Sequence, residues 1–291
     1  MYDTILVPTD GNGPANRAVE TALELGQHFD ATTHAIYVMD LFEVPDSLAA
    51  DAEPIFGEVG RAALDMATEA GESVGVPIHT ELVPGTESIH AAIVDYAREH
   101  AIDLIVMGSM GRTGISRIML GSVTERTLRH SPIPVLTIKE FPLSQDIKRV
   151  LVPTDGSEGA IAAANHAIEF AKVADASLHV VNAVDVAGLG GGELMTGSIY
   201  EEFEALGKQA VEDVISRAKD ADLTSVEATV ITGPAGRAIC NYADKRNIDI
   251  IVIGTHGRSG LDRVLLGSVA EKVVRLAEMP VLTVNVRAVR G

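Results

Sequence analysis

One stretch of this sequence occurs twice. Residues 102–125 read IDLIVMGSMGRTGISRIMLGSVTE, and residues 248–271 read IDIIVIGTHGRSGLDRVLLGSVAE. Each copy begins with an apolar run rich in β-branched residues, which predicts one buried strand. The chain leaves that strand at Gly108 or Gly254; a second glycine follows after two residues, and a Gly-Ser pair after nine more. This order predicts a buried strand, a glycine-rich loop and then a helix.

The end of each copy has features suited to a phosphate group. Ser122 with Glu125, and Ser268 with Glu271, have the spacing of capping boxes, so we expect each serine to cap a helix. A helix N-terminus offers unpaired amides, and glycines let backbone approach a ligand. The loops could add cationic charge from Arg112, Arg117, Arg258 and Arg263. The alternative is a glycine-rich surface loop closed by an ordinary capped helix, but identical spacing in two copies favours a ligand site.

The spacing G-x-x-G-x9-G-S after a buried strand resembles the nucleotide-binding signature of the universal stress protein family. The resemblance includes two first-strand ends, VPTDG at 7–11 and 152–156, and two closing strands, PVLTI at 134–138 and PVLTV at 280–284. It covers nearly the whole chain, twice. It implies two tandem α/β domains, each a doubly wound five-stranded parallel sheet (Rossmann-like, adenine nucleotide alpha hydrolase-like) with strand order 3-2-1-4-5.

The order of elements predicts the same organisation. Alternating strand and helix patterns indicate βαβ units and hence parallel sheets. We expect domain 1 at residues 1–140 and domain 2 at 147–286, joined by a linker within 139–148. In the first half, the acidic stretch 41–52 is predicted to be irregular, with a helix following at 59–74. In the second half, five glycines within 188–198 are interpreted as a flexible connection, another phosphate loop being the alternative.

Composition limits the classes of protein and partner. The chain has 291 residues, 46% of them apolar, which is enough for two cores, and no apolar run long enough to span a membrane. The N-terminus lacks a signal-peptide pattern, so we expect a soluble, cytoplasmic protein. A net charge of −18 argues against binding to nucleic acid or anionic membranes. The acidic bias suits a halophile, and an ordinary acidic protein remains the alternative. The single cysteine, Cys240, is expected in the core.

In a doubly wound sheet, ligands bind beyond the carboxyl ends of the strands where the strand order reverses, here between strands one and four. The resemblance implies that the strand-one aspartates bond ribose hydroxyls or help to hold a metal; turn-forming Asp-Gly pairs are the alternative. It implies that strand-two ends meet adenine, and that the glycines, serines and following valines take ribose and phosphates. The implied residues are Thr9, Asp10, Val38, Gly108, Gly111, Arg112, Gly121, Ser122 and Val123 in the first half, and Thr154, Asp155, Ala183, Gly254, Gly257, Arg258, Gly267, Ser268 and Val269 in the second.

The two halves differ in the turn after strand one. The second half has Asp155-Gly-Ser-Glu158, as the family usually does, whereas the first has Asp10-Gly-Asn-Gly-Pro14. Asn12 therefore replaces the hydroxyl of Ser157. We expect both sites to form but to differ in affinity.

The resemblance implies a nucleotide-binding stress-response regulator or nucleotide sensor that holds ATP, or ADP or AMP, with Mg or Mn. Hydrolysis is expected to be slow or absent, because the sequence has no Walker motif, no G-x-S-x-G and no positioned general base. We assign no catalytic residue and no metal ligand. The alternatives are an adenylyl-transferring or ATP-hydrolysing enzyme of the same superfamily, and a scaffold with vestigial sites. We expect an intramolecular pseudo-dimer through edge strands 135–138 and 281–284; a homodimer and the identity of a protein partner stay open.

Overall fold

The chain divides into two compact units, Met1–Gln145 and Asp146–Gly291. The computed structural model describes residues 1–42, 44–85, 87–109, 120–139, 143, 146–185, 197–255 and 266–286. Much of the predicted linker and most of the glycine run at 188–198 lie outside these ranges. The packing of the two units through their edge strands stays a prediction.

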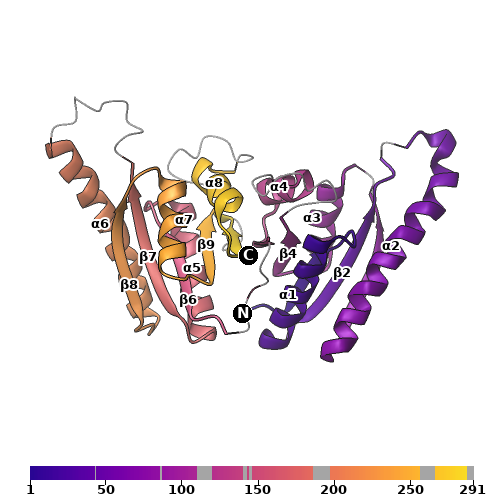
Figure 1. Ribbon diagram of the computed structural model, residues 1–291, viewed down its shortest axis with the longest axis horizontal. Coiled ribbons are helices and arrows are strands. Elements are labelled where there is room, and N and C mark those ends of the chain that lie inside the picture. Colours follow the sequence, from indigo (N-terminus) through magenta and orange to yellow (C-terminus); the bar gives the residue numbers. More distant parts are fainter. Residues whose placement is uncertain are drawn as a thin grey trace. The chain divides into compact units, whose positions relative to one another are not determined.

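Unit 1 alternates strands and helices along the chain. Its elements are, in order, β1 (Thr4–Pro8), α1 (Gly13–Phe29), β2 (Thr32–Met39), α2 (Asp46–Val74), β3 (Ile78–Pro84), α3 (Ile89–Glu99), β4 (Leu104–Gly108), α4 (Ser122–His130) and β5 (Val135–Ile138). The strands lie in the order β3-β2-β1-β4-β5, and every pair is parallel. Side chains alternate along β2, so that Tyr37 abuts α2 at Gly60 while His34 contacts α3 at Tyr96. Helices therefore cover both faces of this sheet (Figure 1).

Unit 2 repeats this architecture. Its elements are β6 (Arg149–Pro153), α5 (Glu158–Val173), β7 (Ser177–Val184), α6 (Gly197–Asp220), β8 (Val226–Thr232), α7 (Ala235–Lys245), β9 (Ile250–Gly254), α8 (Ser268–Leu276) and β10 (Val281–Val284). The strand order is β8-β7-β6-β9-β10, again parallel throughout. The predicted fold class and the predicted strand order 3-2-1-4-5 are confirmed in each unit.

The apolar runs of the sequence form the central strands. Ile5, Leu6 and Val7 of β1 have no exposed surface, and the same holds for residues 150–152 of β6. Strands buried on both faces lack the alternation of polar and apolar residues that marks a half-exposed strand. Cys240 is buried in α7, as expected. Among the described residues, no helix is long and apolar enough to cross a membrane.

One sequence-based expectation about secondary structure is wrong. Residues 46–52 belong to α2, which begins at Asp46 and runs for 29 residues with Pro54 inside it. The sequence showed no sign of a helix here because the described apolar residues of this segment do not face the core. Leu48 and Ile55 keep a helical spacing, but their side chains are 54% and 64% exposed.

Candidate functional site

A pocket lies at the carboxyl ends of β1 and β4 in unit 1, where the strand order reverses. Its volume is about 520 Å³. Seven of the predicted residues line it: Thr9, Asp10, Val38, Gly108, Gly121, Ser122 and Val123. These residues come from segments as far apart in the sequence as Thr9 and Val123, and the fold brings them together at one edge of the sheet.

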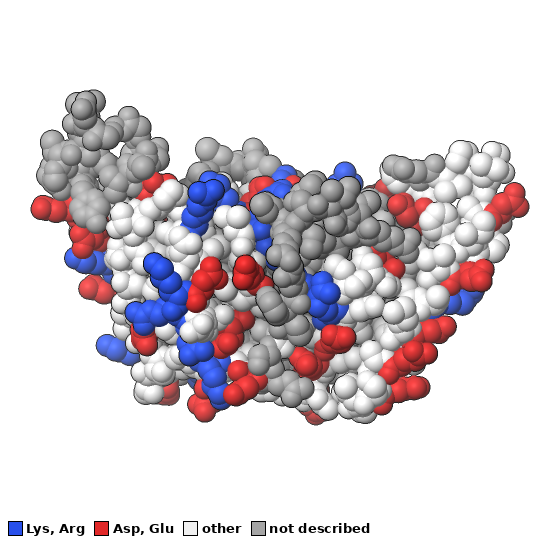
Figure 2. Space-filling view, viewed as in Figure 1, with Lys and Arg blue, Asp and Glu red and all other residues white. Residues whose placement is uncertain are grey.

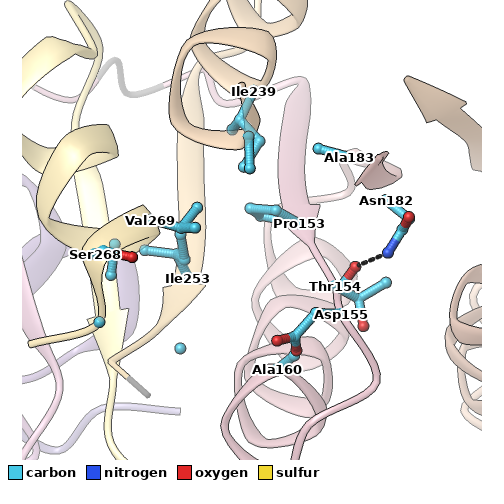
Figure 3. Close-up of a pocket in the computed structure, with 14 residues that line it drawn as sticks. Pro153, Thr154, Asp155, Ala160, Asn182, Ala183, Ile239, Ile253, Ser268 and Val269 are labelled. Atoms are coloured by element: carbon cyan, nitrogen blue, oxygen red, sulfur yellow. Dashed lines mark hydrogen bonds between the residues drawn. The ribbon is translucent and has the colours of Figure 1, made fainter. Parts of the chain in front are cut away.

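Unit 2 has the equivalent pocket at the ends of β6 and β9, with a volume of about 300 Å³ (Figure 3). Seven predicted residues line it as well: Thr154, Asp155, Ala183, Gly254, Gly267, Ser268 and Val269. Figure 3 shows Ser268 and Val269 of α8 on one side of the pocket and Thr154 and Asp155 on the other. The same parts of each duplicated half therefore meet at the same place.

The turn that follows the first strand of each unit has the same construction. The hydroxyl Oγ1 of Thr9 accepts a hydrogen bond from the backbone N–H of Gly11 (3.2 Å), and Thr154 does the same for Gly156 (3.2 Å). Gly11 and Gly156 have φ values of +75° and +79°, a left-handed conformation that favours glycine. Thr9 and Thr154 are more than 90% buried, so their side chains fix the turn that carries the aspartate.

In unit 1, both carboxylate oxygens of Asp10 accept hydrogen bonds from Asn12. The backbone N–H of Asn12 donates to Oδ1 (3.2 Å), and its side-chain Nδ2 donates to Oδ2 (2.9 Å). Oδ1 of Asn12 also accepts from the N–H of Ala15 (2.9 Å) and caps α1. Asn12 therefore holds the carboxylate and starts the helix at the same time.

In unit 2, Ser157 also contacts the aspartate and caps the helix. Its backbone N–H donates to Oδ1 of Asp155 (3.0 Å), and its Oγ accepts from the N–H of Ala160 (3.2 Å) to cap α5. Asn12 reaches Oδ2 of Asp10 through its side-chain amide, whereas the bond described between Ser157 and Asp155 comes from the backbone N–H of Ser157. The predicted difference between the turns thus becomes a difference in how each aspartate is held.

Gly108 and Gly254 line the pockets, but their lack of a side chain serves helix packing as well. A Cβ at Gly108 would lie 2.7 Å from the carbonyl oxygen of Pro14, at the start of α1. A Cβ at Gly254 would overlap the carbonyl of Gly159, at the start of α5. We interpreted these glycines as backbone that a ligand can approach closely. The structure gives them a second role, because they also let the first helix pack against the end of the fourth strand.

The capping boxes predicted at Ser122 and Ser268 are wrong by one residue. Gly121 and Gly267 are the N-caps, and the serines are the first helical residues of α4 and α8. Each glutamate of the predicted box instead pairs along the helix: Glu125 Oε1 with Arg129 (2.6 Å), and Glu271 Oε1 with Arg275 (3.0 Å). A glycine N-cap has no side chain to accept from the first-turn amides, so water or a ligand can accept from them instead.

Backbone and side-chain contacts tie the cap to the preceding strand. The N–H of Gly121 donates to the carbonyl of Ser109 (2.8 Å), and Oγ1 of Thr124 donates to the carbonyl of Gly108 (2.8 Å). In unit 2 the N–H of Gly267 donates to the carbonyl of Thr255 (2.7 Å). The helix N-termini are thus fixed beside the strand ends.

The sequence did not indicate several lining residues. In unit 1 these include Tyr37, Asp40, Phe56, Ile89 and Ile93; in unit 2 they include Asn182, Ala235 and Ile239. Asn182 is buried and donates from Nδ2 to the carbonyl of Thr154 (2.8 Å; Figure 3). One signal could have found the isoleucines: they lie in the first two turns of the helix after the third strand, and the N-terminus of that helix faces the same sheet edge.

Four predicted site residues, Gly111, Arg112, Gly257 and Arg258, lie outside the described residues, as do Arg117 and Arg263. Among the described residues that line the pockets there is no lysine or arginine, and the charged side chains are Asp10, Asp40 and Asp155. Within the described part of the chain, no group of three or more His, Cys, Asp or Glu side chains is placed to hold a metal ion.

Comparison with known proteins agrees with the duplicated architecture. The universal stress protein family matches residues 1–139 and again 146–285. A universal stress protein of Mycolicibacterium smegmatis is 25% identical, over 97% of both chains. One from Methanocaldococcus jannaschii is 37% identical over 48% of this chain and 84% of its own length. The crystal structure of a universal stress protein from Archaeoglobus fulgidus, 21% identical, covers 97% of this chain and 96% of its own with a TM-score of 0.71, which shows a shared fold. The chain therefore belongs to the universal stress protein family, as a tandem member with two family domains.

Proposed function

We propose that each unit binds an adenine nucleotide, ATP in the first instance, and that the protein acts as a nucleotide-responsive regulator with slow or no hydrolysis. One observation carries this proposal. The aspartate after the first strand, the glycine that ends the fourth and the Gly-Ser-Val that opens the next helix all line a single pocket, and they do so in both units.

The pockets suit the parts of a nucleotide. Their volumes of about 300 and 520 Å³ lie within the usual range for small-molecule sites. The first turn of α4 or α8, with glycine as its N-cap, would hold phosphate oxygens through backbone amides and the helix dipole. Asp10 or Asp155 would accept from ribose hydroxyls. The base would lie against apolar side chains such as Ile93 in unit 1 and Ile239 in unit 2.

A bound nucleotide would bring its metal ion with it. Mg²⁺ or Mn²⁺ in such sites is held by phosphate oxygens together with one or two carboxylates and water. Each pocket has one aspartate at the equivalent position, Asp10 in unit 1 and Asp155 in unit 2. We place them at the ribose, away from the helix N-terminus that would hold the phosphates. In that position neither would align a water molecule for attack on the terminal phosphate, so we expect hydrolysis to be slow.

Direct analysis of the purified protein tests the proposal. The full chain would be denatured, the supernatant chromatographed for co-purified nucleotide, and the nucleotide-free protein titrated with Mg-ATP by calorimetry. We expect two equivalents of ATP per chain. A chain that binds no adenine nucleotide would contradict the proposal. A steady-state ATPase rate above about 1 per second, within the ordinary enzyme range, would favour the enzyme alternative.

A further inference from the structure

Helix α2 carries an apolar stripe on its solvent side. The side chains of Leu48, Ile55, Val59 and Met66 are 54%, 64%, 40% and 45% exposed. Burying such side chains is favourable, and contiguous exposed apolar patches mark interaction sites. Single apolar residues are scattered over any protein surface, but the exposed apolar side chains of α2 lie together on one helix and need a separate explanation.

The spacing of the stripe is that of a coiled-coil seam. With the small residues Ala52 and Ala62 included, the positions are 48, 52, 55, 59, 62 and 66, so the steps alternate between four and three residues. That alternation is the a/d pattern of a helix that packs along another helix. The stripe is distinct from the core-facing side of α2, where Gly60 abuts Tyr37 and where Ala63 and Ala67 are buried.

The duplicated half provides an internal comparison. Gly207 of α6 abuts Asn182 as Gly60 of α2 abuts Tyr37, and Asn182 is the β7 counterpart of Tyr37, so the two helices can be aligned on their glycines. In that alignment, positions 55, 59, 62 and 66 correspond to Glu202, Leu206, Gln209 and Asp213. At these four positions unit 2 therefore has two acidic residues, one amide and one leucine; positions 48 and 52 correspond to Met195 and Ile199 in the sequence, where the structure describes no side chains. Apolar residues at positions 55 and 66 are thus not a requirement of the fold, since unit 2 builds the same fold with acidic residues there.

Acidic side chains follow the stripe along one side. Asp51, Glu58 and Asp65 are exposed and recur every seven residues. In the space-filling view, red side chains run along the surface of α2 beside uncharged surface (Figure 2). The whole helix contains seven acidic residues, Asp46, Asp51, Glu53, Glu58, Asp65, Glu69 and Glu72, against one basic residue, Arg61.

We propose that this surface, the α2 stripe of Leu48, Ala52, Ile55, Val59, Ala62 and Met66, docks an amphipathic helix of a partner protein whose apolar seam is flanked by Lys or Arg. The acidic row selects the partner, because unlike charges beside a seam favour pairing and like charges oppose it. In an antiparallel pair, two copies of α2 would bring their acidic rows together. An anionic lipid surface would be repelled by the same row.

The α2 stripe adjoins the pocket of unit 1. Phe56, the neighbour of Ile55, lines that pocket, and a Cβ at Gly11 would lie 4.0 Å from the sulfur of Met66. A helix docked on the stripe would therefore lie on the element that also borders the Asp10 turn. The docking itself does not depend on nucleotide binding.

The test uses the full chain and a labelled helical peptide of about four heptads, with Leu at a and d and Lys at e and g. Fluorescence anisotropy would measure its affinity, and a peptide with Glu at e and g is the matched control. The double variant Ile55→Glu, Met66→Asp gives α2 the residues of unit 2 at these positions. Leu206→Glu on α6 is the control for an exposed apolar residue outside the stripe, and circular dichroism checks the fold of both.

We expect the basic peptide to bind the wild-type chain. Its binding should weaken with added salt, because salt screens exposed charges. Its affinity for the double variant should be at least about tenfold lower, equivalent to 1.4 kcal/mol or more. Leu206→Glu should bind as the wild type does. The proposal is overturned if the basic peptide does not bind, if the acidic peptide binds equally well, or if the double variant is unaffected. A concentration-dependent dimer abolished by the double variant would make a second copy the occupant instead. Binding to phosphatidylglycerol vesicles through the same residues would make it a lipid surface.

Discussion

His166 is a residue at which the two units differ in a way that affects stability. It lies on α5, and burial lowers the pKa of its imidazole from 6.5 to about 4. Counted from the N-caps Asn12 and Ser157, the position corresponds to Thr21 of α1, a residue with no exposed surface. Unit 2 therefore buries a titratable ring where unit 1 has a hydroxyl.

Acidification should destabilise unit 2 through His166. Because the folded pKa lies below the unfolded value, the unfolded chain binds the proton more tightly, and stability falls as the pH drops from about 6.5 towards 4. The full shift corresponds to about 3 kcal/mol, and because the largely buried side chain keeps some solvent exposure it should deliver less, about 1–3 kcal/mol. Urea unfolding of the full chain at several pH values would measure it. His166→Gln should flatten the profile between pH 6.5 and 4 and match the wild-type pH dependence above pH 7. Equal acid sensitivity in the variant would assign the effect to other groups.

At the scale of elements, the contact between the first helix and the fourth strand depends on one missing side chain. Gly254→Ala would push a methyl group into the carbonyl of Gly159, and Gly108→Ala would push one against Pro14. Each should lower the free energy of unfolding by about 1–3 kcal/mol, the usual cost of overpacking. Denaturant unfolding of both variants checks this. Gly75→Ala is a useful contrast: an added methyl group there would meet no other atom within 4 Å, but Gly75 has a φ of +72°, so the cost would be backbone strain alone.

The helix starts show where sequence reasoning stops. The alternation of strands and helices followed from the sequence pattern, and the family resemblance implied the strand order and therefore the positions of the pockets. The N-cap followed from neither. Gly121 and Ser122 are both acceptable caps, and Glu125 lies three residues from Ser122 and four from Arg129. Only the packed structure decides that Glu125 pairs with Arg129.

The same limit applies to the walls of the pockets. Phe56 and Asn182 come from elements whose sequences give no sign of a ligand, and they line the pockets because the fold brings them to the edge of the sheet. The outer surface of α2 was missed for a related reason. Its exposed apolar residues, such as Leu48 and Ile55, lie among acidic residues in the sequence, and only the structure shows that they share one side of a helix.

At the scale of the whole molecule, the two sites should differ in affinity, and the structure indicates which residue is responsible. Asn12 donates from its side chain to Asp10, whereas Ser157 bonds its aspartate through the backbone. A ribose hydroxyl at site 1 would share that carboxylate with the side-chain amide of Asn12. One neutral hydrogen bond is worth about 0.5–1.5 kcal/mol net, so site 1 should bind ATP several-fold to about tenfold more weakly.

Exchange of the two residues tests this directly. Gly121→Val and Gly267→Val would each place a branched side chain at a phosphate cradle, so each should leave one equivalent of bound ATP. In the Gly267→Val background, Asn12→Ser should tighten site 1 by several-fold to about tenfold, because serine can cap α1 without the side-chain amide that donates to Oδ2 of Asp10. In the Gly121→Val background, Ser157→Asn should weaken site 2 by a similar factor. Calorimetric titration with Mg-ATP measures all four. If either glycine variant still binds two equivalents, the cradles are misassigned; if the cradles hold but the exchange changes nothing, the carboxylate does not contact the ribose.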